Sequence, residues 1–99
     1  MNIKMVNRGT EAEMLMIGRL DASTAKEAEE ILVSTAEKFE KLVLNFAELE
    51  YISSAGLRIL KILHMNMAKK GGKLVLKNVN DLVMEVFEMT GFAGILSFE

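Results

Sequence analysis

The chain has 99 residues, of which 51 % are hydrophobic and 26 % charged, with a formal net charge of −2. A slightly acidic chain without a basic cluster offers no electrostatic basis for binding nucleic acid. The absence of cysteine excludes disulfides, thiolate metal ligands and thiol nucleophiles. Length and composition together predict one globular domain spanning residues 1–99.

Two further features bear on the location of the protein. No uninterrupted apolar run approaches the length of a membrane-spanning helix. Residues Met1–Lys4 lack the apolar stretch that begins a signal peptide. We therefore expect a cytoplasmic protein that does not insert into a membrane.

The chain opens with two extended segments, Asn2–Val6 and Ala12–Leu20. The residues between them, Asn7–Thr10, are typical of a turn, so the pair predicts an antiparallel hairpin. Within the second segment, Met14 and Met16 alternate with more polar residues and are expected to face a core.

An amphipathic helix is predicted next, from about Ser23 to Phe39, because its apolar residues recur at helical spacing. The run Thr24–Glu27 fits a capping box at its start, with Asp21 or Ser23 as alternative caps. Its charged side chains face water, so the opposite face is expected to pack on a sheet.

The rest of the chain alternates strands with helices. The helix Ser54–Lys70 is apolar on nearly all sides and should be well buried. The predicted elements are the strand Lys41–Phe46, the helix Ser54–Lys70, the strand Leu74–Leu76, the helix Leu82–Thr90 and the strand Ile95–Phe98, with Ala47–Ile52 as a connection.

This order predicts an α/β fold in which a single-layer mixed β-sheet of about five strands packs against helices. The element order is β-β-α-β-α-β-α-β. Strands joined by helices of this length require right-handed crossovers and parallel pairing, whereas the first hairpin adds an antiparallel edge.

The combinations of residues that catalysis commonly uses are mostly missing. The chain has one histidine, His64, on the polar strip of the second long helix, where a surface histidine is the commoner explanation. A lone histidine without cysteine supplies too few ligands for a transition metal, and no glycine-rich nucleotide motif occurs. A hydrolase with Ser54 as nucleophile is disfavoured because no base can be paired with it. We predict no enzymatic activity, no metal and no cofactor.

The pair Ser53-Ser54 stands where a buried strand region passes into a helix. One explanation is structural, since serine is a favoured N-cap worth about 1 kcal/mol. One cap needs only one hydroxyl, however, and the small residues Ala55 and Gly56 leave the surface open. The amino end of a helix also tolerates an anion. We therefore interpret this stretch as a place where a serine can carry a phosphate.

At these residues the chain resembles the STAS domain family, and within it the bacterial anti-sigma factor antagonists, also called anti-anti-sigma factors. The resemblance spans nearly all of the chain and rests on Gly18–Asp21, Leu42–Phe46 and Ile52–Arg58. Further matches are Gly71-Gly72 before a strand and Phe87-x-x-Thr90-Gly91 near the end. The resemblance implies a mixed sheet of four or five strands with helices against it.

The resemblance also implies a switch. In the family, an unphosphorylated antagonist binds an anti-sigma factor that is also a serine kinase, and so frees a sigma factor for transcription. The kinase then phosphorylates a serine of the antagonist, and a metal-dependent serine phosphatase resets it. Aligned on Gly56-Leu57, the phosphoacceptor position falls on Ser54. Asp21 matches an acidic position near it, whereas Ser53 stands where many antagonists have aspartate and is a rival acceptor.

We expect the partner, an anti-sigma factor with serine kinase activity, to contact the loop after the second strand and the start of the second long helix. A serine phosphatase would be a second partner. The free protein is expected to be a monomer. The alternative is a STAS module that is not phosphorylated, such as a transporter-accessory or signalling-complex subunit. The residues expected to contact the partner are Asp21, Ser23, Thr24, Ser53, Ser54, Ala55, Gly56, Leu57, Arg58 and Lys61.

Overall fold

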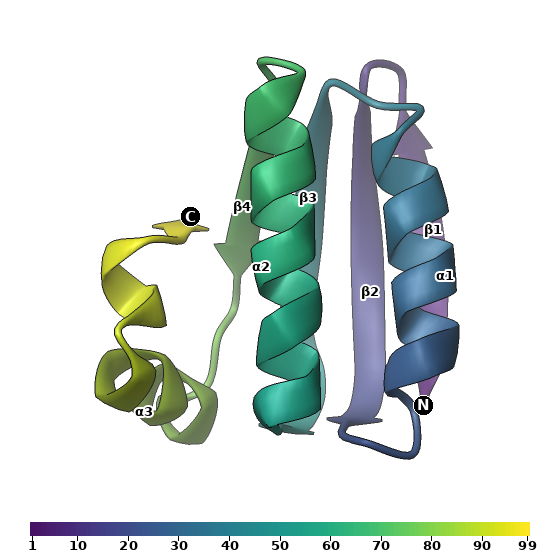
Figure 1. The fold of residues 1–99 in the computed structure, drawn as a ribbon. Coiled ribbons are helices and arrows are strands. Elements are labelled where there is room, and N and C mark those ends of the chain that lie inside the picture. Colours follow the sequence, from purple (N-terminus) through teal and green to yellow (C-terminus); the bar gives the residue numbers. More distant parts are fainter.

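A computed structural model describes all residues of the chain, 1–99. It contains five strands and three α-helices (Figure 1). A short 3₁₀ helix, Phe92–Gly94, precedes the last strand. The elements are β1 (Asn2–Arg8), β2 (Glu11–Leu20), α1 (Ala25–Ala36), β3 (Lys41–Ile52), α2 (Ser54–Lys69), β4 (Lys73–Lys77), α3 (Asp81–Thr90) and β5 (Ser97–Phe98).

The five strands form one mixed sheet in the order β1-β2-β3-β4-β5. The hairpin β1–β2 is antiparallel, and the other three pairings are parallel. The predicted fold class and element order are therefore confirmed. Because β2 and β3 run in the same direction, their carboxyl ends lie at one edge of the sheet, and α1 and α2 both begin there (Figure 1).

The hydrophobic core lies between the helices and one face of the sheet. Met14 and Met16 are each only 1 % exposed in it, as their alternation predicted. The third helix joins the same core through Phe87, whose ring centroid lies 6.5 Å from that of Phe46 on β3. In Figure 1, α2 lies between α1 and α3, so it is the most enclosed helix.

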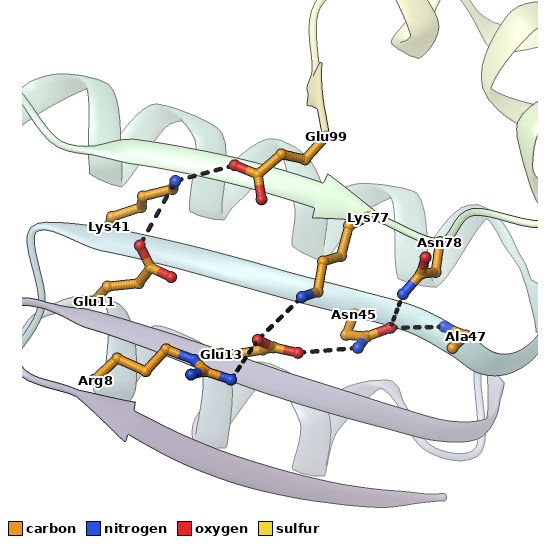
Figure 2. A network of polar contacts seen from close by, with 9 residues as sticks. All are labelled: Arg8, Glu11, Glu13, Lys41, Asn45, Ala47, Lys77, Asn78 and Glu99. Carbon is orange, nitrogen blue, oxygen red and sulfur yellow. Dashed lines mark hydrogen bonds and ion pairs between the residues drawn. The ribbon is translucent and has the colours of Figure 1, made fainter.

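The opposite face of the sheet carries a network of polar side chains (Figure 2). At its centre is Glu13, whose side chain is only 7 % exposed. Its carboxylate accepts hydrogen bonds from Asn45 Nδ2 at 2.9 Å, Lys77 Nζ at 3.2 Å and an Arg8 guanidinium nitrogen at 3.3 Å. These bonds, chiefly the one from Asn45, hold the pKa of Glu13 below its ordinary value of 4.5.

The third strand is longer than predicted, since it continues beyond Phe46 to Ile52. Residues 47–52 were predicted to be a connection, because alanine and glutamate have little preference for strands. In the structure, β2 pairs with this segment up to the register Leu20↔Ile52, with bulges on the way. Leu49 and Ile52 are buried, so tertiary packing decides the conformation here.

The first helix is shorter than predicted, and the capping box at its start does not form. Thr24 occupies the N-cap position, but its side chain makes no hydrogen bond to the helix. Its hydroxyl instead accepts from the Asp21 N–H at 3.0 Å and donates to the Arg19 carbonyl at 2.9 Å. The last strand is also shorter than predicted, because the N–H groups of Ile95 and Leu96 donate to the Phe92 carbonyl instead of joining the sheet.

Candidate functional site

Two loops meet at the edge of the sheet where β2 and β3 end. The loop Asp21–Thr24 follows β2, and Ser53 follows β3. The Ser53 N–H donates to the Leu20 carbonyl at 2.9 Å, which ties the two loops together. The structure therefore brings the predicted acidic loop beside the predicted serine pair.

Gly56 allows α2 to begin close against the sheet. A Cβ atom at this position would lie 2.6 Å from Ile52 Cγ1 and 2.9 Å from Leu20 Cγ. Both distances are shorter than real Cβ contacts, so only glycine fits unless the Ile52 and Leu20 side chains or the start of α2 shift. The close approach fixes where the serines stand relative to the loop after β2.

The acidic loop is held by its own side chains. Asp21 Oδ1 accepts from the Ser23 hydroxyl at 2.6 Å and from the Ser23 N–H at 3.0 Å. These bonds hold the pKa of Asp21 below its ordinary value of 3.8, with a smaller contribution from Arg19, whose Nε lies 3.6 Å from Oδ2. The guanidinium of Arg19 also lies over the ring of Tyr51, 4.7 Å from its centroid. The loop therefore holds Asp21 in place, ionised and paired with Arg19, one residue after the Leu20 carbonyl that accepts from Ser53 N–H.

The two serines differ in accessibility. Ser54 is exposed in the first turn of α2. Ser53 occupies the N-cap position, but its side chain makes no capping hydrogen bond, and its Oγ is buried without any partner. Neither the histidine nor any carboxylate hydrogen-bonds to Ser54. The structure thus offers one hydroxyl to solvent and encloses the other.

The remaining residues predicted to contact a partner differ in exposure. Ser23, Arg58 and Lys61 are exposed, and Thr24 and Ala55 are half-buried. Gly56 and Leu57 are buried, so they support this surface from beneath. Arg58 points toward α1, where a guanidinium nitrogen lies 3.3 Å from Glu29 Oε1.

Sequence reasoning missed Glu29 and Tyr51 as neighbours of the site. Glu29 was interpreted only as part of a solvated helix face. Its partner could be found from the sequence only by fixing the rotation of α1 relative to α2. Tyr51 was assigned to a connection, and the pairing Arg19↔Tyr51 depends on the unpredicted end of β3.

No helix of the structure is both long enough and apolar enough to cross a membrane. No three histidine or acidic side chains come together as they would around a metal ion. The fold and its edge loops define a small mixed-sheet α/β domain with an exposed serine at the start of its most enclosed helix.

A family model of the STAS domain matches residues 5–99, and the chain belongs to that family. The candidate anti-sigma factor antagonist BtrV of Bordetella bronchiseptica is 37 % identical over 79 residues, which cover 79 % of this chain and 68 % of BtrV. The anti-sigma-B factor antagonist of Bacillus subtilis is 25 % identical over 95 residues, covering 96 % of this chain and 87 % of that protein.

Among solved structures, the unphosphorylated form of the anti-sigma factor antagonist SpoIIAA aligns with a TM-score of 0.85 at 15 % identity. The alignment covers 99 % of this chain and 88 % of that one. At this identity the likeness concerns the fold, and it confirms the mixed sheet with three helices.

Proposed function

We propose that this chain is an anti-sigma factor antagonist. In its unphosphorylated form it binds an anti-sigma factor of the serine kinase type, and phosphorylation of Ser54 releases it. The observation that carries the proposal is the exposed Ser54 hydroxyl at the meeting point of the two edge loops. The names of the relatives BtrV and the anti-sigma-B factor antagonist support the partner class.

Accessibility favours Ser54 over Ser53 as the phosphoacceptor. A kinase must bring ATP to the attacking oxygen, and the Oγ of Ser53 is buried. Phosphorylating Ser53 would first require its side chain to rotate and bring the buried Oγ to the surface. Ser54 needs no such movement.

The proposed modification is an ordinary phosphoryl transfer. The Oγ of Ser54 forms a bond to the γ-phosphorus of ATP, the bond from that phosphorus to ADP breaks, and the hydroxyl proton passes to a base on the kinase. A phosphatase reverses the change when water attacks the phosphorus, which returns inorganic phosphate and the free hydroxyl.

The added charge explains the release. A phosphoserine carries about −1.5 to −2 charges at pH 7. Against a closely packed or acidic partner surface, such a charge costs several kcal/mol, and about 4 kcal/mol corresponds to a thousandfold weaker complex. The domain itself should stay folded, because a phosphate at the amino end of a helix is favoured by the helix dipole.

The direct test is to incubate the protein with its cognate anti-sigma kinase and ATP, and to locate the phosphate by peptide mass spectrometry. We expect modification of Ser54 in the wild type and in Ser53→Ala, and none in Ser54→Ala. Phosphate on Ser53, or no phosphate on either serine, would contradict the proposal.

A binding experiment separates the switch from the alternative, a STAS module that binds its partner without phosphorylation. Affinity for the anti-sigma factor is measured by calorimetry for the wild type, Ser54→Asp and Ser54→Ala. The switch predicts a large loss for Ser54→Asp and little change for Ser54→Ala. Equal affinity of all three proteins would favour the constitutive module.

A further inference from the structure

Arg58 is placed to respond to a phosphate on Ser54. It is the only charged residue between Ser54 and Leu60, the first seven residues of α2. Its side chain is 70 % exposed and lies against Glu29 of α1, whose side chain is 34 % exposed. The contact is a single ion pair of 3.3 Å. Exposed pairs of this kind contribute little stability and rearrange readily.

Helix geometry brings Arg58 over Ser54. Residues four apart on an α-helix lie on the same face, with their Cβ atoms about 5–6 Å apart. Helical side chains lean toward the amino end, so the long side chain of a residue four positions later reaches back over the earlier one. The guanidinium of Arg58 can therefore reach either Glu29 across the helix interface or an anion on Ser54 within its own helix.

We propose that phosphorylation of Ser54 draws Arg58 from Glu29 onto the phosphate. This inference rests on the proposed function, since it concerns the consequence of the same modification. Before modification, Arg58 joins the starts of α1 and α2. After modification, Arg58 pairs within α2, and Glu29 is left without a cation.

The phosphate is the stronger of the two competitors for Arg58. It carries nearly twice the charge of a carboxylate and presents three acceptor oxygens, which a guanidinium binds in bidentate fashion. It also belongs to the same rigid helix, whereas Glu29 depends on the packing of α1 against α2. No other cation contacts Glu29, so its charge is then uncompensated.

The exchange spreads the effect of one phosphate over two helices. At the edge where α1 and α2 begin, the surface gains the phosphate and loses the free donors of Arg58. The carboxylate of Glu29 becomes free at the same edge. A protein bound across the starts of α1 and α2 would therefore meet a changed charge pattern on both helices.

The test uses phosphoserine installed at position 54 during synthesis by genetic code expansion, so that no kinase is needed. The second pKa of the phosphate, about 6 in a free phosphoserine, is measured by ³¹P NMR titration. We expect Arg58→Gln to raise this pKa by about half a unit, because an exposed cation is lost from the phosphate. The matched control is Lys26→Gln, which removes the same charge from the first turn of α1.

A second readout follows the fate of Glu29. Its ¹³Cδ carboxylate signal is compared between the free-serine and phosphoserine forms. We expect the signal to move on phosphorylation in the wild type and to move much less in Arg58→Gln, where Glu29 has no arginine to lose. Amide ¹H–¹⁵N spectra confirm that each variant is folded.

An unchanged phosphate pKa in Arg58→Gln would overturn the proposal, and so would equal shifts in Arg58→Gln and Lys26→Gln. A Glu29 signal that moves as much in Arg58→Gln as in the wild type would also overturn it. These outcomes are independent of the kinase assay above. The exchange can therefore fail while Ser54 is still phosphorylated, and it can hold even if no kinase modifies Ser54.

Discussion

Two polar regions of the molecule differ in whether their polar side chains have hydrogen-bond partners. On the open face of the sheet, the nearly buried Glu13 is satisfied by Asn45, Lys77 and Arg8 (Figure 2). At the edge where α1 and α2 begin, the Oγ of Ser53 is buried without a partner, and Ser54 is exposed. Both regions involve the strands β2 and β3, but Glu13 lies near the start of β2, whereas the serines follow the end of β3.

The difference separates a structural polar group from one available for chemistry. A carboxylate with three partners stabilises the fold and has little capacity left for another ligand. A surface hydroxyl without a partner costs nothing to expose and is open to modification. Four substitutions test this distinction, beginning with the one expected to have the largest effect.

Gly56→Val should destabilise the domain most, because the added side chain overlaps the buried side chains of Ile52 and Leu20. The first added carbon would already lie 2.6 Å from Ile52 Cγ1, and two further methyl groups follow. We expect the free energy of unfolding to fall by about 3 kcal/mol or more, measured by urea denaturation. Gly94→Val is the control, since nothing lies within 4 Å of its Cβ, and it should cost much less. Similar losses for both variants would contradict the close approach at Gly56.

Glu13→Gln should lower the free energy of unfolding at pH 7 by about 1–3 kcal/mol, because charged hydrogen bonds to Lys77 and Arg8 are weakened. The contribution of Glu13 to the free energy of unfolding also depends on pH. The folded pKa of Glu13 is depressed, so its contribution is present above the ordinary value of 4.5 and is lost as the pH falls through the folded pKa. Urea denaturation between pH 7 and pH 3 should therefore show a steeper loss in the wild type than in Glu13→Gln.

The matched control for Glu13 is Glu48→Gln, an exposed carboxylate on β3. Its stability and pH dependence should stay close to those of the wild type. If Glu13→Gln were as stable as the wild type, the network on the open face would contribute no stability and the contrast between the two regions would fail.

Asp21→Ala should have a smaller and more local effect. The substitution removes the acceptor of the Ser23 hydroxyl and N–H, so the loop after β2 loosens while the core stays intact. We expect faster amide hydrogen exchange at Ser23, and a decrease in Tm smaller than that of Glu13→Gln. Unchanged exchange at Ser23 would show that other contacts hold the loop.

Ser53→Ala should have the smallest effect on stability. The direction of the change shows whether the Ser53 hydroxyl is a buried unpaired group or a helix cap. Burying a hydroxyl without a partner is unfavourable, so its removal should leave the free energy of unfolding unchanged or raise it by up to about 1 kcal/mol. The comparison is Asn80→Ala at the N-cap of α3, where the side chain accepts from Val83 N–H at 2.8 Å and donates to the Leu49 carbonyl at 2.9 Å. That variant should lose at least about 1 kcal/mol in the same thermal or urea measurement. A loss of similar size for Ser53→Ala would show that its hydroxyl acts as a cap.

The order of elements could be predicted from the sequence, because it depends on signals that are local. Alternation in β2, the apolar run of β3 and the helical spacing of α2 each indicate one conformation over several residues. The ends of α3 could also be predicted from the sequence. Asn80 stands directly before an apolar helical pattern, and Gly91, with a φ of 84°, ends the helix. The parallel arrangement then follows from the lengths of the connections.

The details at the edge of the sheet could not be predicted, because distant contacts decide them. Thr24 has the residue type and spacing of a helix cap, yet its hydroxyl bonds to the Arg19 carbonyl instead. The end of β3 is extended because β2 pairs with it, against the weak strand preference of Ala47 and Glu48. The burial of the Ser53 Oγ depends on how the first turn of α2 lies on the sheet.

Glu13 illustrates the same limit on the open face. Strand alternation places it away from the hydrophobic core, where a glutamate would ordinarily be solvated. Its burial arises because Arg8, Asn45 and Lys77 come from three other strands and converge on it. Only the pairing register brings these four residues together, so no single segment of the sequence carries the signal.

Lys70 joins α1 and α2 at the end of the helices that lies opposite the serines. The Nζ of Lys70, directly after α2, donates to the carbonyls of Ala36, Glu37 and Phe39 at the end of α1, at 2.8, 3.1 and 2.9 Å. These three bonds hold the two helices together at their carboxyl ends, whereas one exposed ion pair, between Arg58 and Glu29, links them near their amino ends. The two helices are therefore joined by three hydrogen bonds at one end and by one exposed ion pair at the other, so losing the Arg58–Glu29 pair leaves the contact between the helices at Lys70 intact.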